Sequence, residues 1–229
     1  MTVRACALCG TSARQPFRAP PAEMAPDLDL RPGEPARSTM RFWIQTCTEC
    51  GASAPDLASL PDGARAVVEE PDYGALRGTG VADGFLRWAA IAERCGQPAD
   101  AAEATLQAAW VLDDAGQDAG QDGAGQDRAT LRLTAVALWG PPDGPQAALR
   151  QADVLRRAGA LDRAAAMLDR VGPGDESTSA ILAFQRGLVA VQDRGCHSIA
   201  TALRPPARRP HASHGATDAK KGFWARLRG

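Results

Sequence analysis

The chain of 229 residues is poor in lysine, histidine and aromatic side chains. Lys220 and Lys221 are the two lysines among its 26 cationic residues, and it has three histidines. No Gly-x-Ser-x-Gly, P-loop, HExxH or dinucleotide-binding motif occurs in it. The common signatures of hydrolases, metalloproteases and nucleotide-binding enzymes are therefore missing. We expect that the protein is not an enzyme.

Long apolar segments are also missing. There is no run of 18 apolar residues, so no membrane-spanning helix is predicted. Residues 1–10 lack the basic and apolar regions of a secretory signal. We therefore expect a cytoplasmic protein in a reducing environment, where its six cysteines do not form disulfides.

Charge is balanced overall but unevenly placed. The net charge is −1, which gives no bulk attraction to nucleic acid or to a membrane. Residues 204–229 carry seven Arg or Lys and one Asp, a net of +6, which leaves −7 for the rest of the chain. The sequence thus joins an acidic body to a basic tail.

Four cysteines stand in two matching motifs, Cys6-Ala-Leu-Cys9-Gly10 and Cys47-Thr-Glu-Cys50-Gly51. A Cys-x-x-Cys pair brings two thiolates to one ion, and two pairs complete a tetrahedral four-sulfur site. The glycine after each pair suits a tight turn that brings backbone N–H groups close to the sulfurs. The sequence predicts a zinc ribbon with Cys6, Cys9, Cys47 and Cys50 as the ligands of a structural Zn²⁺.

Alternatives to zinc were weighed on the same residues. A thioredoxin-type motif needs a βαβ setting, which neither motif has. Iron suits the same four-sulfur cage and stays open as the metal. A site with four thiolate ligands has no free position for water, so it is structural and not catalytic. Cys95 and Cys196 are unpaired on apolar stretches and are expected to be small buried hydrophobes.

Residues 1–60 are predicted to form the zinc ribbon, with a long loop from Gln15 to Arg37 between the two motifs. The alternating pattern from Ser38 to Thr46 predicts a strand that ends at the second motif. Residues 61–80 are rich in glycine and proline and are expected to be a linker, with a short helix near Ala64–Glu70.

Residues 81–200 have helical periodicity. Six helices are predicted, and the last five are placed near Pro98–Trp110, Arg128–Trp139, Pro145–Ala158, Leu161–Val171 and Ser177–Val191. The short turns predict antiparallel hairpins, and two turns, Cys95-Gly-Gln-Pro-Ala-Asp and Ala158-Gly-Ala-Leu-Asp, resemble each other. The fold class is therefore mainly α, with tetratricopeptide-like hairpins. A plain alanine-rich bundle is the alternative.

Residues 201–229 contain several prolines and few apolar residues, so a disordered basic tail is predicted. The tail ends in an amphipathic motif in which Phe223, Trp224 and Leu227 are flanked by cations. Such a motif is typical of a peptide that docks on a partner. A tail that folds back on the body is the alternative.

The two cysteine motifs, the Phe42-Trp43-Ile44 stretch and the segment Cys47-Thr-Glu-Cys50-Gly51-Ala-Ser-Ala-Pro-Asp56 resemble the uncharacterised bacterial DUF2225 family. That family joins a split CxxC zinc ribbon to tetratricopeptide-like helices. Its second motif continues Gly-Tyr-Ala, whereas this chain has Ala52 in place of the tyrosine. The resemblance covers the ribbon and implies the fold of the helices, and it implies no enzymatic activity.

Two functions remain. The first is a non-catalytic zinc-binding scaffold whose helices bind a protein or peptide. The second is a nucleic-acid-binding ribbon assisted by the basic tail. The loops of the two motifs contain no Arg or Lys, and Arg4, Arg14, Arg18 and Arg41 are scattered in the sequence, whereas nucleic-acid binding needs clustered cations. We therefore expect a protein partner and not nucleic acid.

Overall fold

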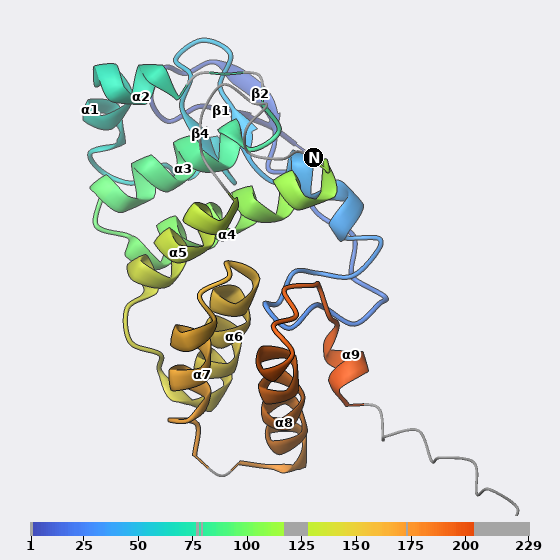
Figure 1. Ribbon diagram of the computed structural model, residues 1–229. Coiled ribbons are helices and arrows are strands. Elements are labelled where there is room, and N and C mark those ends of the chain that lie inside the picture. The colour runs from blue at the N-terminus through green and yellow to red at the C-terminus, as the bar shows by residue number, and fades with distance from the viewer. Residues whose placement is uncertain (1, 77, 79, 117–127, 173, 204–229) are drawn as a thin grey trace, which may run out of the picture.

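The computed structural model describes residues 2–76, 78, 80–116, 128–172 and 174–203. Helices dominate these residues, and a small β module lies near the N-terminus (Figure 1). In this module β1 (Thr2–Ala5) pairs antiparallel with β2 (Ser12–Gln15), and β3 (Gln45–Thr46) pairs antiparallel with β4 (Ser53–Ala54). The prediction of a mainly α protein with a small N-terminal β module is confirmed.

Helices that follow one another in the chain pack side by side. The helix α4 (Pro98–Asp114) contacts both α3 (Asp83–Arg94) and α5 (Arg128–Trp139). The second group is formed by α6 (Gly144–Arg157), α7 (Leu161–Leu168) and α8 (Glu176–Ala190), and α6 also contacts α5. Figure 1 shows the second group below the first. These are the predicted helical hairpins, while a tetratricopeptide-like arrangement stays a prediction.

The two similar turns seen in the sequence have the same backbone geometry. Gly96 and Gly159 adopt φ values of 76° and 79°. In each turn the next residue donates its N–H to a carbonyl near the end of the preceding helix, Gln97 N to Ala92 O (2.8 Å) and Ala160 N to Leu155 O (2.9 Å). This is the Schellman arrangement, in which a left-handed glycine ends a helix and satisfies its last carbonyls.

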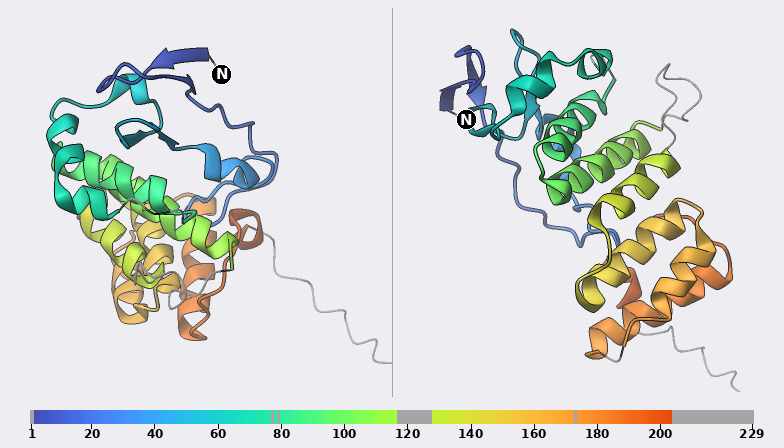
Figure 2. Two further views of the ribbon diagram at one scale, coloured as in Figure 1. Left: turned by 90° about the horizontal axis from the view of Figure 1, so that it is seen from above. Right: turned by 90° about the vertical axis from the view of Figure 1, so that its left-hand side faces the viewer.

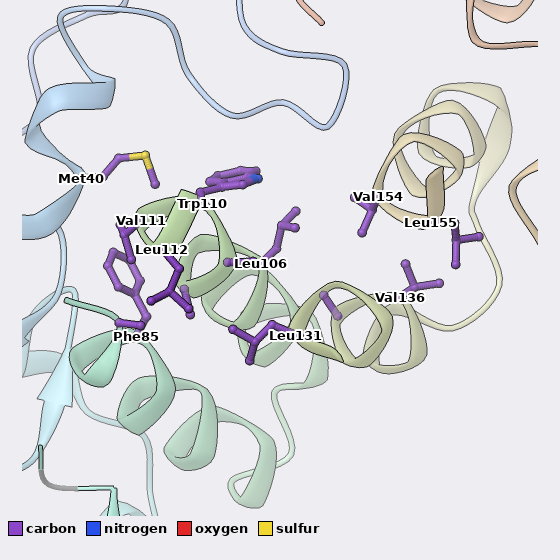
Figure 3. Packing of buried hydrophobic residues seen from close by; sticks show 14 of the residues in the cluster. Met40, Phe85, Leu106, Trp110, Val111, Leu112, Leu131, Val136, Val154 and Leu155 are labelled. Atoms are coloured by element: carbon purple, nitrogen blue, oxygen red, sulfur yellow. The ribbon is translucent and has the colours of Figure 1, made fainter. Parts of the chain in front are cut away.

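The main hydrophobic core lies between α3, α4, α5 and α6. Small side chains such as Ala108, Ala109 and Ala135 are fully buried and let the helices approach closely. Larger residues fill the space between them, as Figure 3 shows for Phe85, Leu106, Trp110, Leu131, Val136, Val154 and Leu155. Met40 reaches this core from outside the helical body and is 1% exposed, so it fastens the N-terminal module to the helices.

The predicted strand from Ser38 to Thr46 is wrong over most of its length. The 3₁₀ helix η1 (Arg37–Phe42) occupies its first part, and only Gln45–Thr46 form a strand. Local side-chain bonds favour the turn, because the Glu34 carboxylate accepts from both N and Oγ of Ser38. The alternating pattern misled because Met40 is buried while Phe42, expected on the same face, is 45% exposed.

Further short helices surround the β module and end the described chain. They are η2 (Leu57–Ser59), α1 (Ala64–Glu69), α2 (Pro71–Ala75) and α9 (Ile199–Ala202). Thus the expected linker at 61–80 contains two short helices, α1 and α2. Among the described residues, none of the helices is both long and apolar enough to cross a membrane.

Residues 16–36, here called the strap, connect β2 to η1 without forming a helix or strand element. The right-hand view of Figure 2 shows the strap running from the N-terminal module down to the lower helices. There Leu28 N donates to His197 O and Ile199 N donates to Pro26 O, both at 2.9 Å. Leu28 is 3% exposed and packs with Leu188 and Ala202. The strap therefore links the first part of the described chain to the last.

Candidate metal centre

The four predicted cysteine ligands lie together. Their Sγ atoms are all within 4.8 Å of one another. Cys6 Sγ is 3.8 Å from Cys50 Sγ, and Cys9 Sγ is 3.5 Å from Cys47 Sγ. A tetrahedron with zinc–sulfur bonds of 2.3 Å has sulfur–sulfur edges of about 3.8 Å. The four thiol groups are thus spaced as the ligands of one ion.

The backbone of the two motifs is nearly identical. Gly10 and Gly51 both have a φ of 76°, and their N–H groups donate to Cys6 O (2.9 Å) and Cys47 O (3.0 Å). A left-handed residue closes each turn so that both cysteines of a motif face the same point, and glycine adopts this conformation without strain. The two turns therefore present two sulfurs each from opposite sides of the site.

The thiol groups differ in acidity because their surroundings differ. Burial raises the pKa of Cys6, which the N–H groups of Cys9 and Leu8 partly oppose. Burial also raises the pKa of Cys50 to about 12. Hydrogen bonding from Thr11 lowers the pKa of Cys9 to about 6. Since thiolates are the metal ligands, binding of an ion at neutral pH displaces protons from Cys6 and Cys50.

The site rests on a small hydrophobic core that joins it to α1, α2 and α3. Cys6 and Cys47 are both 3% exposed and pack in this core with Leu57, Val67, Tyr73 and Ile91. Tyr73 is fully buried, and its hydroxyl donates to Gly51 O (3.1 Å), which supports the second turn. Tyr73 was not predicted, because a single tyrosine in a glycine-rich segment gives no signal of its position.

Gln15 supports the first motif from β2. Its side chain is fully buried, its Nε2 donates to Arg4 O (3.3 Å), and its Oε1 accepts from Leu57 N (2.6 Å). It therefore ties β1 and η2 together beneath the first pair of cysteines. Sequence reasoning missed this role, since a glutamine at the end of a strand usually faces solvent.

The donor set fits a metal and limits its chemistry. Four cysteine sulfurs favour Zn²⁺ or iron over harder cations such as Mg²⁺ and Ca²⁺. No water or substrate position remains when all four coordinate, so the centre stabilises structure. The structure confirms the predicted clustering of Cys6, Cys9, Cys47 and Cys50, while the identity of the metal stays a prediction.

A buried ionic cluster fastens the strap to the helices. Asp29 is fully buried, and its carboxylate accepts from Trp110 Nε1 (2.8 Å) and pairs with Arg157. Arg31 is 2% exposed and pairs with Asp27 and with Asp114 at the end of α4. Burial alone raises the pKa of Asp29, but Arg157 and Trp110 outweigh it and hold that pKa below its ordinary value.

The expectation that Cys95 and Cys196 are buried on helices is wrong. Cys95 is half-buried at the end of α3, and Cys196 is exposed in the segment between α8 and α9. Cys196 Sγ donates to Asp27 (2.8 Å), and His197 Nε2 lies 2.9 Å from Asp193 Oδ2. The two neighbours thus face different acidic partners. Phe223, Trp224 and Leu227 lie outside the described residues.

No protein-family model, curated protein or solved structure matches this chain. The resemblance to the DUF2225 family therefore stays a prediction, and the function has to be argued from the four-cysteine centre and the helical body alone.

Proposed function

We propose that the protein is a non-catalytic scaffold, in which a structural Zn²⁺ stabilises the N-terminal module and the helical body binds a protein or peptide partner. The observation that carries the proposal is the closed four-cysteine centre, which has a ligand geometry for one ion and no open position. The strap supports it further, because buried contacts of Leu28 and Asp29 join the module to the helices. A rigid platform of two joined parts suits binding more than chemistry.

The absence of a nucleophile–base pair at Cys196 and His197 supports a non-catalytic role. Their side chains bond to Asp27 and Asp193, and the His197 ring packs edge-on against Phe184 at 5.6 Å between centroids. Cys196 also has a raised pKa, through burial and then through Asp27, so its thiol is a poor nucleophile at neutral pH.

The metal is tested by replacing one ligand and one matched cysteine. Cys47→Ser removes a buried ligand, while Cys95→Ser changes a half-buried cysteine outside the centre. We expect the wild type and Cys95→Ser to hold one zinc per chain, and Cys47→Ser to lose the metal and the folded module, because metal binding supplies folding energy. Elemental analysis and thermal unfolding measure both. Unchanged zinc in Cys47→Ser would contradict the proposal, and iron in the wild type would change the metal alone.

The partner is tested by photo-crosslinking in a native lysate. Lysine-directed reagents would miss the body, because Lys220 and Lys221 are the chain's two lysines. A photoreactive residue is therefore placed at exposed positions of α5, such as Thr134 or Ala137, and at Val3 in β1 as a control. Protein crosslinks from α5 that persist in nuclease and at moderate salt support the scaffold. Crosslinks that vanish with nuclease, or that form equally from Val3, contradict it.

A further inference from the structure

Two aromatic side chains and two arginines meet where the strap leaves the N-terminal module. Phe17 in the strap and Phe42 at the end of η1 have ring centroids 5.6 Å apart. Arg18 follows Phe17 directly, and the guanidinium carbon of Arg41 lies 4.6 Å over the Phe42 ring. We call these four residues the aromatic–arginine patch. The ring contact brings together arginines that are scattered in the sequence.

The patch has a positive charge that the body does not neutralise. Arg18 and Arg41 are both exposed, and neither forms an ion pair with any residue that the structure describes. In contrast, the nearby Arg4 pairs with Asp56, and Arg37 pairs with Asp114. Two free guanidinium groups beside an exposed ring leave a local attraction for anions on an otherwise acidic body.

An apolar cleft of about 450 Å³ or less is large enough to receive a planar ring, and one of 380 Å³ lies beside the patch. Its walls include Pro16, Phe17, Trp43 and Ile44. Trp43 Nε1 donates to Thr39 Oγ1 (3.1 Å), which holds the indole in place. The surface therefore offers a flat apolar slot, an exposed ring and two cations within one area.

We propose that the aromatic–arginine patch binds single-stranded nucleic acid. Unpaired bases stack on exposed aromatic rings, and arginines contact the phosphates between them. An acidic peptide would satisfy Arg18 and Arg41, but it has no group for the exposed face of Phe42 or for the slot. The proposal goes beyond the scaffold function and departs from the expectation drawn from the sequence, where the arginines looked unclustered.

The test measures binding of a fluorescent single strand of about 12 nucleotides to the full zinc-loaded chain by anisotropy, at about 50 and 200 mM salt. Arg18→Gln with Arg41→Gln removes the two cations of the patch. We expect affinity to fall on the order of tenfold, and the salt dependence to lose about 0.7 per phosphate contact. The control is Arg163→Gln with Arg170→Gln, which removes two other exposed arginines without a described ion pair.

Stacking is tested separately by Phe42→Leu, which keeps an apolar side chain but removes the ring. Because Phe42 is 45% exposed, the variant should fold, and its circular dichroism and zinc content check this. We expect roughly tenfold weaker binding. Equal affinity in all variants, or equal loss in the control pair, would overturn the proposal, since the basic tail would then account for the binding. Displacement of the strand by polyglutamate at matched charge would also overturn it, in favour of an acidic protein.

Discussion

Asp29 is the residue on which the attachment of the strap depends most. Its buried carboxylate has Arg157 and Trp110 as partners, and its own carbonyl accepts from Arg150 Nε (2.9 Å). Removing one member of a buried ion pair is costly because the remaining charge keeps its desolvation penalty. The strap thus relies on one carboxylate that no surface contact can replace.

Asp29→Asn is expected to lower the free energy of unfolding by about 3 kcal/mol near neutral pH. The pKa of Asp29 is lowered in the folded protein, so its contribution is present above the ordinary value of about 3.9 and is lost as pH falls below it. The difference between the wild type and Asp29→Asn should therefore shrink in acid. Urea unfolding at several pH values measures it. Exposed Asp143→Asn is the control, and an equal effect there would refute the role of Asp29.

The sequence predicted the metal ligands but not these buried charges. Cysteine spacing is a local signal, since each Cys-x-x-Cys turn is complete within a few residues. Asp29 and Arg157 are paired across most of the chain, and neither has a neighbour in sequence that marks it. An aspartate in a proline-rich loop reads as a surface residue until its partner is known.

At the scale of elements, helix positions followed from periodicity and turn residues. The predicted Arg128–Trp139 agrees with α5, and the other long helices agree within a few residues, because Gly96, Gly159 and Pro98 mark their ends. The segment at 38–46 failed because Met40 packs on distant helices, and periodicity does not report such contacts.

Two glycine substitutions should separate local strain from loss of packing. At Gly10, with φ 76°, an added Cβ meets no atom within 4 Å, so Gly10→Ala should cost only about 1 kcal/mol of backbone strain. At Gly33 in the strap, an added Cβ would collide with the carbonyl oxygen of Met24. Gly33→Ala should therefore displace the strap and increase hydrogen exchange at Leu28, whereas Gly10→Ala should not. Equal exchange in both variants would show that the strap tolerates the change.

At the scale of the whole molecule, the described helices and the metal centre end before residue 204. Shortening the chain to residues 1–203 is expected to leave the helical circular dichroism signal per molecule unchanged, because the cores contain no residue beyond Ala202 among those described. A large loss of helix would show that the tail supports the body. The wild type with its full tail, measured in the same buffer, is the control.

The pairing of the strap with the segment before α9 has a consequence for synthesis on the ribosome. The cysteines are all made by residue 50, so the metal centre can form early, whereas Leu28 waits for His197 and Asp29 waits for Arg157. Until those residues emerge, the strap exposes an unpaired aspartate and an apolar leucine. The nascent chain therefore passes through a stage with a finished head and an open joint, and its two ends close last.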